Sequence, residues 1–339
     1  MTNSNVSLDD KYSIESGRIF VTGVQALARI PMVQRQRDVL EGLNTAGFIS
    51  GYRGSPVGGF DQQLWRAKKF LEQNHIRFQP GLNEDLAASA IWGSQQTNLH
   101  EGGKYDGVFA IWYGKGPGVD RCGDVFKHGN MSGPAKHGGV LLIAGDDHAA
   151  KSSTVPHQSE YAFMDASIPV LNPAGLQDIV DYGILGFAMS RFSGCWVAFK
   201  TTAENMDSSA SIDVSPDRVK ISLPKFDMPE GGLSIRWPDD WIEQEHRLHQ
   251  YKLNAVRAFA RQNKIDKTII NSQNPKLGVV TTGKSYLDVR QALEDLGIDE
   301  AKADKIGLRL YKVGMPWPLE PQGIDEFSQG LKEILVIEE

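Results

Sequence analysis

The chain has 339 residues, of which 40% are apolar, and its 36 basic and 42 acidic side chains give a formal charge of −6. At roughly 150 residues per domain, this length predicts two domains. No basic stretch offsets the negative charge, which argues against binding to nucleic acid. With only 2 cysteines, the sequence excludes a disulfide scaffold, a zinc site built on paired cysteines and a cysteine-ligated iron–sulfur cluster within these residues.

Residues 1–17 are polar and predict a lead-in that lacks the apolar core of a signal peptide. Farther along, no apolar run approaches the ~20 residues that are needed to cross a bilayer. We therefore expect a cytoplasmic protein that makes no contact with a membrane.

Short apolar runs alternate with segments of helical spacing through the first half of the chain. They predict strands at 48–50, 108–112, 140–144, 170–171 and 195–199, with helices at 62–73 and 176–190. Continuous apolar runs are typical of strands that are buried on both faces, and their alternation with helices predicts a parallel α/β sheet. Such sheets bind their ligands at the carboxyl ends of the strands.

The second half begins differently. Frequent proline, glycine and serine predict a long connection over residues 203–240, and a charged amphipathic helix follows at 241–262. A second α/β unit is then predicted, with strands at 277–280, 308–313 and 334–337 and helices at 286–296 and 324–332. Because nothing follows the last strand to cover it, we expect the natural chain to continue beyond Glu339.

Three segments carry candidate functional residues, and each also has an ordinary structural explanation. Residues 51–59 are rich in glycine, which allows close approach to a ligand but also occurs in ordinary strand–helix connections. Glu84 begins a small, apolar helix. Its carboxylate either interacts with the helix dipole, which would stabilise the helix by ~1 kcal/mol, or is held at the edge of a site that excludes water, for acid–base chemistry. Residues 115–130 mix glycines with cations and predict either an anion-binding loop or a solvated one.

Two further patterns imitate nucleotide and metal motifs. Residues 278–285 match GxxxxGK[ST], but a phosphate loop needs a strand that ends before its first glycine, and here the strand itself is predicted at 277–280. A P-loop protein using Lys284 and Ser285 remains an alternative. Gly145-Asp146-Asp147, with Asn172 downstream, imitates the Gly-Asp-Gly motif of thiamine enzymes but lacks its second glycine, so we discount it.

The order of these motifs resembles the N-terminal part of the fused, single-chain indolepyruvate:ferredoxin oxidoreductases. These are thiamine-diphosphate-dependent 2-oxoacid:ferredoxin oxidoreductases. The resemblance covers nearly the whole chain and is carried by Gly51-Tyr52-Arg53-Gly54-Ser55-Pro56, Asn83-Glu84-Asp85-Leu86-Ala87, Gly114-Lys115-Gly116-Pro117-Gly118, Asp146-Asp147-His148, Ser152-Ser153, His157-Gln158-Ser159-Glu160 and the run from Leu308 to Leu319.

The resemblance implies a fold and an activity. The fold is a parallel-sheet, thiamine-diphosphate pyrimidine-binding domain at 18–225, a linker and amphipathic helix at 226–270, and the start of a transketolase-C-terminal-like α/β domain at 271–339. The activity is the oxidative decarboxylation of an aryl or branched 2-oxoacid to acyl-CoA, with reduction of ferredoxin.

The resemblance also implies roles for particular residues. Glu84 matches the catalytic glutamate that hydrogen-bonds the N1′ nitrogen of the cofactor's aminopyrimidine. Gly54, Ser55 and Pro56 match cofactor-binding positions, and Ser55 also lies near the oxoacid. Lys115 and Arg121 are candidates for binding the oxoacid carboxylate or coenzyme A. No residue is assigned to a metal.

Several parts of the family's machinery have no counterpart in these residues. Mg²⁺ with its Gly-Asp-Gly motif and the [4Fe-4S] clusters are expected only in the remainder of the chain. The fragment would hold half of a cofactor site, so we expect it to be inactive alone. A homodimer is expected because thiamine sites lie at domain or subunit interfaces. A third hypothesis is a non-catalytic α/β interaction module.

Overall fold

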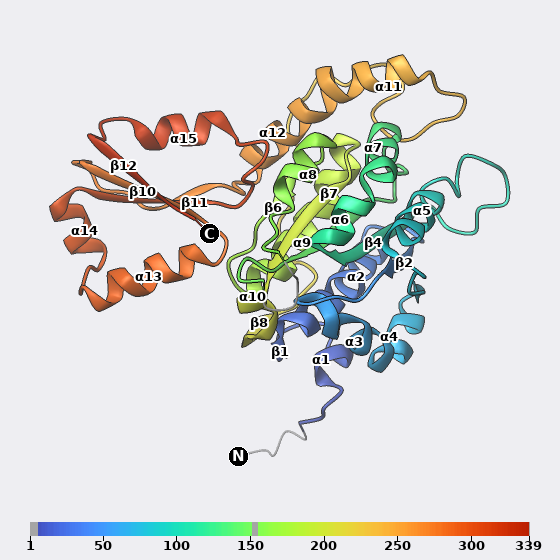
Figure 1. Ribbon diagram of the computed structural model, residues 1–339, viewed down its shortest axis with the longest axis horizontal. Coiled ribbons are helices and arrows are strands. Elements are labelled where there is room, and N and C mark those ends of the chain that lie inside the picture. Colours follow the sequence, from blue (N-terminus) through green and yellow to red (C-terminus); the bar gives the residue numbers. More distant parts are fainter. Residues whose placement is uncertain (1–5, 151–154, 339) are drawn as a thin grey trace.

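A computed structural model describes residues 6–150 and 155–338, which form two α/β lobes joined by a helical arm (Figure 1). The first lobe is built on a six-stranded sheet of order β3-β2-β4-β5-β7-β6, in which every neighbouring pair is parallel. Its strands are β2 (Ala46–Gly51), β3 (Ile76–Phe78), β4 (Val108–Lys115), β5 (Val140–Asp146), β6 (Val170–Leu171) and β7 (Val197–Thr202). The predicted parallel α/β sheet is confirmed.

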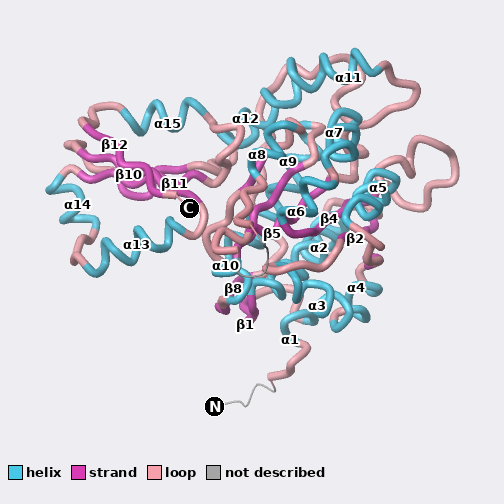
Figure 2. The backbone as a smooth tube through the Cα atoms, in the orientation of Figure 1, coloured by secondary structure: helices cyan, strands magenta, loops and turns pink. Residues whose placement is uncertain are grey.

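Helices cover both faces of this sheet (Figure 2), as a parallel sheet requires. They are α1 (Asp10–Ser13), α2 (Gly23–Leu40), the 3₁₀ turn η1 (Val57–Gly59), α3 (Phe60–Arg66), α4 (Lys68–Gln73), α5 (Glu84–Ser94), α6 (Gly116–Arg121), α7 (Gly123–Ser132), α8 (Glu160–Asp165), α9 (Leu176–Ser193) and α10 (Ala203–Asp207). A small antiparallel ribbon pairs β1 (Arg18–Thr22) with β8 (Ser209–Asp213).

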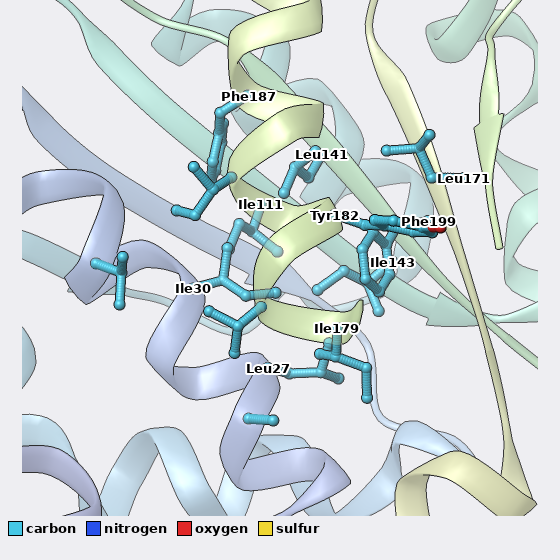
Figure 3. Close-up of a cluster of buried hydrophobic side chains, with 14 of the residues drawn as sticks. Leu27, Ile30, Ile111, Leu141, Ile143, Leu171, Ile179, Tyr182, Phe187 and Phe199 are labelled. Atoms are coloured by element: carbon cyan, nitrogen blue, oxygen red, sulfur yellow. The ribbon is translucent and has the colours of Figure 1, made fainter. Parts of the chain in front are cut away.

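The main core lies between one face of the sheet and helices α2 and α9 (Figure 3). Helix α9 is apolar on most faces because the sheet, α2 and the arm all pack against it. Gly183 lets α2 approach closely, since a Cβ at this position would lie 2.7 Å from Cδ1 of Ile30. On the opposite face, α5 and α7 cover a second cluster that includes Trp112, Phe126 and Trp196.

Two segments have more structure than predicted. They are the N-terminal segment, predicted as a polar lead-in, and residues 203–240, predicted as a long connection. Tyr12 is buried, and the fully buried guanidinium of Arg29 donates to the carbonyl oxygens of Tyr12 at 2.6 Å and Ile14 at 2.8 Å. Strand β8, in the predicted connection, pairs with β1. The strand pattern was weak there because only one face of this ribbon is buried.

The arm comprises α11 (Trp241–Arg247), a π-helical turn η2 (Leu248–Lys252) and α12 (Leu253–Gln262). The second lobe is a four-stranded sheet of order β12-β10-β11-β9, in which only β9 runs antiparallel to its neighbour. Its elements are β9 (Lys267–Ile270), β10 (Leu277–Thr282), α13 (Ser285–Asp295), α14 (Glu300–Ile306), β11 (Leu308–Val313), α15 (Pro321–Ser328) and β12 (Glu333–Ile337).

The chain that follows β11 joins the two lobes. The backbone N–H of Asn172 donates to the carbonyl of Gly314 at 2.9 Å, and that of Val170 donates to the carbonyl of Trp317 at 2.7 Å. The second lobe therefore lies along β6, the edge strand of the first sheet. Within the described residues, no helix combines the length and apolar character needed to cross a membrane.

Candidate active site

The carboxyl ends of β2, β4 and β5 lie side by side and bring the predicted functional segments together. Residues 52–59 follow β2, residues 116–121 follow β4, and residues 147–150 follow β5. Strands of a parallel sheet all end at the same edge, so segments that are distant in sequence become neighbours there. This edge carries the candidate site.

Glu84 is fixed as the first residue of α5 by its backbone. The segment before it runs along the end of β2, where the N–H groups of Gln79 and Gly81 donate to the carbonyls of Ile49 and Gly51, each at 2.9 Å. The indole N–H of Trp112 then donates to the carbonyl of Glu84 at 3.0 Å. Strands β2 and β4 therefore set the position of Glu84.

The side chain of Glu84 is 10% exposed and lies against the backbone of α6. A Cβ on Gly118 would come within 2.6 Å of Cγ of Glu84, so this contact requires glycine. The guanidinium Nε of Arg121 is 3.9 Å from a carboxylate oxygen of Glu84. Among the described residues no hydrogen bond reaches this carboxyl group, which therefore keeps its capacity to bind a donor or share a proton.

The Gly54-Ser55-Pro56 segment lies between the ends of three strands. A Cβ on Gly54 would be 2.8 Å from Cδ of Lys115, so the Lys115 side chain lies over this glycine. Pro56 is buried and packs against Gly145 near the end of β5, whereas Ser55 is exposed. The structure thus places Lys115 on Gly54 and Arg121 beside Glu84.

The glycine-rich loop predicted at 115–130 is wrong, because this segment forms α6 and α7. Three of its four glycines, Gly116, Gly118 and Gly129, are positions of close approach to other side chains rather than turns. Gly129, for example, faces the ring of Trp196, and a Cβ there would lie 2.3 Å from Cζ2. Two of its basic residues lie on the surface of α7, where Lys127 pairs with Asp165 and His128 lies 3.6 Å from Asp124.

His157 and Asp146, for which no role was predicted, meet at the same edge. Asp146 is fully buried and accepts hydrogen bonds from the backbone N–H and the hydroxyl of Ser159. His157 lies between two carboxylates, with Nε2 2.8 Å from Asp120 and Nδ1 3.6 Å from Asp146. Asp146 and then Asp120 raise the pKa of His157 to about 9, against the opposing effect of burial. The signal in the sequence was the position of Asp146 at a strand end.

The P-loop alternative is wrong. Gly278 lies inside β10, and only Gly283 and Lys284 separate this strand from α13. A phosphate loop needs several free backbone N–H groups between strand and helix, and no such length of chain is present. Lys284 donates instead to Asp288 at 2.7 Å. In the part of the chain that the structure describes, no cluster of His, Cys, Asp and Glu could hold a metal ion.

Comparison with known proteins agrees with the motifs. Residues 267–339 match a family model described as "Indolepyruvate oxidoreductase domain". The chain is 26% identical to the indolepyruvate oxidoreductase subunit IorA of Pyrococcus abyssi, over 95% of this chain and 45% of that protein. It is 25% identical to the protein of the same name from Methanothermobacter thermautotrophicus, over 96% of this chain and 47% of that protein. The predicted resemblance to the indolepyruvate oxidoreductases is confirmed.

The chain spans about half the length of the indolepyruvate oxidoreductase subunits that it matches. Its fold is similar to a structure of 2-oxoglutarate:ferredoxin oxidoreductase from Magnetococcus marinus with 2-oxoglutarate, coenzyme A and succinyl-CoA bound. The TM-score is 0.67 at 15% identity, over 94% of this chain and 57% of that chain. This likeness supports the α/β fold of the chain.

Proposed function

We propose that this chain forms the pyrimidine-binding part of a thiamine-diphosphate-dependent indolepyruvate:ferredoxin oxidoreductase. The complete enzyme would decarboxylate an aryl or branched 2-oxoacid oxidatively, form acyl-CoA and reduce ferredoxin. The observation that carries the proposal is Glu84, a nearly buried carboxyl group with unused hydrogen-bonding capacity at the edge of the sheet. The similarity of the chain to indolepyruvate oxidoreductase subunits supports the same conclusion.

The residues at this edge fit an aminopyrimidine ring. Gly118 leaves room for the Glu84 side chain against α6, and Gly54 and Pro56 follow β2 at the same edge of the sheet. A buried carboxyl group that accepts no hydrogen bond from the described residues suits a ring nitrogen that must be bound and exchange a proton. When bound, thiamine diphosphate supplies the electron sink for decarboxylation.

The remaining roles belong to this chain's own side chains. Glu84 would bind the N1′ nitrogen and move a proton at that atom. Lys115 and Arg121 would bind the oxoacid carboxylate or coenzyme A, since both carry a cation to the strand ends. The exposed hydroxyl of Ser55 would lie near the oxoacid. Mg²⁺, the iron–sulfur clusters and the ferredoxin contact would belong to the rest of the enzyme.

The assembly follows from the same reasoning. We propose that the chain completes its cofactor site with the remainder of its own chain or with other subunits, in a homodimer or a larger complex, and that it is inactive alone. The location in the cell would be the cytoplasm, where ferredoxin is available.

The test is Glu84→Gln in the full-length enzyme with its partner subunits. Glutamine keeps the volume but cannot exchange the proton, so we expect kcat to fall by roughly 10²–10⁴-fold. Thiamine diphosphate affinity, measured by calorimetry, should also fall. Asp85→Asn is the matched control, because Asp85 lies on the same turn of α5 whereas the atoms nearest to Gly118 belong to Glu84.

Unchanged turnover in Glu84→Gln would contradict the catalytic role. If the wild-type enzyme bound no thiamine diphosphate at all, the non-catalytic interaction module would take the place of this proposal.

A further inference from the structure

Helix α6 has two faces, and each carries one glycine and one charged residue. Positions three or four apart on a helix lie on the same side, whereas positions two apart point to opposite sides. Gly116 and Asp120 therefore share one face, and Gly118 and Arg121 share the other. The contacts agree with this division, because Gly118 and Arg121 meet Glu84 while Gly116 and Asp120 meet His157.

The contact with His157 is as close as the contact with Glu84. A Cβ on Gly116 would lie 2.1 Å from Nδ1 of His157 and 2.2 Å from Cγ, so the imidazole ring lies directly on the helix backbone. Its Nε2 is 2.8 Å from the carboxylate of Asp120, four residues farther along α6. The His157 side chain is 13% exposed. The ring therefore fixes the first turn of α6 from the side opposite Glu84.

His157 is itself anchored to the sheet. Its Nδ1 lies 3.6 Å from Asp146, the last residue of β5. Asp146 in turn accepts the backbone N–H of Ser159, two residues beyond His157, at 2.9 Å. The imidazole thus connects α6 to the end of β5 through one carboxylate on each element.

We propose that His157 is a positioning residue for Glu84. By bridging Asp120 and Asp146, His157 holds α6 against the side chain of Glu84. Arg121 and Gly118 sit on the same short helix, so a displacement of α6 moves both groups that surround Glu84. This inference rests on the proposed function only for the identity of the ligand that Glu84 binds.

The charges explain why a histidine suits this position. Among the described residues, the charged groups that face His157 are Asp120 from α6 and Asp146 from β5. The imidazole Nε2 is within hydrogen-bond distance of Asp120, whereas Nδ1 faces Asp146 at 3.6 Å, which is an ion-pair distance for an imidazolium and too long for a hydrogen bond. Because the pKa of His157 is about 9, the ring carries its charge at neutral pH. Above pH 9 the ring loses one donor and the bridge weakens.

The test compares His157→Asn with the wild type in the full-length protein and its complex. The control is His128→Asn, because His128 also lies beside an aspartate, Asp124, but is exposed on α7. Without added cofactor, amide hydrogen exchange of residues 116–121 and 84–87 should speed up by about tenfold in His157→Asn and stay unchanged in the control. If His157→Asn folds poorly, Gly116→Ala tests the same contact, because its methyl group would push against the imidazole ring. It should speed up exchange to a similar extent.

A cofactor measurement separates positioning from simple structural support. The dissociation constant of thiamine diphosphate should rise by about tenfold in His157→Asn, as small misplacements of a binding group typically do. In the wild type the affinity should fall between pH 8 and 10, and this dependence should be lost in the variant. Faster exchange with unchanged affinity would overturn the positioning role. Unchanged exchange in both His157→Asn and Gly116→Ala would also overturn it. If the wild type bound no cofactor while exchange still increased, the proposed function would fail and the support of Glu84 by His157 would stand.

Discussion

Lys252 is a buried cation that backbone carbonyls hold in place. Its side chain lies in the π-helical turn of the arm and is 1% exposed. The ammonium group donates to the carbonyls of Asn130 at 3.0 Å and Met131 at 2.8 Å, near the carboxyl end of α7. That end of a helix carries partial negative charge, which favours a cation there. Lys252 therefore attaches the arm to the first lobe.

Burial lowers the pKa of Lys252 to about 8, and this shift predicts a pH dependence. Between pH 8 and the ordinary lysine value of 10.5, the unfolded chain holds a proton that the folded chain has released, so the folded state gains stability as pH rises. Lys252→Met removes this gain. The difference in unfolding free energy between wild type and variant should grow by up to about 3 kcal/mol from pH 7.5 to 10. Parallel urea titrations would measure it, and a pH-independent difference would contradict the lowered pKa.

The residues of the site differ in how far sequence alone could assign them. Glu84 was predictable because it begins an apolar helix within a recognisable motif. His157 was not, because its partners Asp120 and Asp146 come from separate elements and meet it only in the folded chain. Asp146 and His157 both belong to motifs that carry the family resemblance, and Asp146 also belongs to the discounted Gly-Asp-Gly imitation, but neither pattern predicts that they meet. The roles of Glu84, Ser55, Lys115 and Arg121 stay predictions.

At the scale of elements, continuous apolar runs located five of the six strands of the first sheet to within a few residues, but the short edge strand β3 was not predicted. Helix α2 was missed because it buries polar side chains, including Arg29, Gln34 and Asp38, that interrupt the apolar pattern. Asp38 is satisfied by Arg191 of α9 at 2.6 Å, a contact that no local pattern reveals. Helix α6 was mistaken for a loop because its glycines serve close packing, which sequence cannot distinguish from a turn.

The close contact between α2 and α9 gives a prediction of its own. Gly183→Ala would place a methyl group 2.7 Å from two carbons of Ile30, so the helices must separate. We expect a loss of about 1–3 kcal/mol in unfolding free energy, the range typical of overpacked cores. Gly93→Ala is the matched control, because a Cβ at that helical position meets nothing within 4 Å. There, alanine should stabilise the protein by about 0.5–1 kcal/mol.

Chemical denaturation of the wild type, Gly183→Ala and Gly93→Ala would measure these differences in unfolding free energy. The added variant Ile30→Val in the Gly183→Ala background should recover part of the loss, because it removes one of the carbons that the new methyl group meets. Equal stability of Gly183→Ala and wild type would show that the two helices can separate without cost.

At the scale of the whole molecule, a buried ion pair joins the lobes. Lys312 of β11 binds Asp178 of α9, and its side chain is 5% exposed. The ammonium group also lies over the rings of Tyr182 and Tyr286, at 5.6 and 4.7 Å from their centroids. Helix α12 adds a second link, since it packs on α9 while Arg261 at its end binds Glu320 of the second lobe at 2.9 Å. In Figure 1 this helix lies between the two lobes.

Removing one partner of this ion pair should loosen the second lobe. Lys312→Met leaves Asp178 without its cation, which typically costs about 3–5 kcal/mol when a pair is buried. Amide exchange at Asn172, which donates to Gly314 across the lobes, should increase. A double-mutant cycle with Asp178→Asn would isolate the pairwise energy. Additive effects of the two changes would show that the pair does not couple the lobes.

The hydrogen bond from Val170 to Trp317 has a consequence for synthesis on the ribosome. Strand β6 closes the first sheet, yet its outer partner lies ~150 positions later in the chain. At roughly 5–20 residues per second, that partner emerges several seconds to half a minute after β6 itself. During this interval the newly made first lobe has one strand edge open to pairing with other chains. The nascent first lobe therefore presents the outer edge of β6 for pairing until Trp317 has been made.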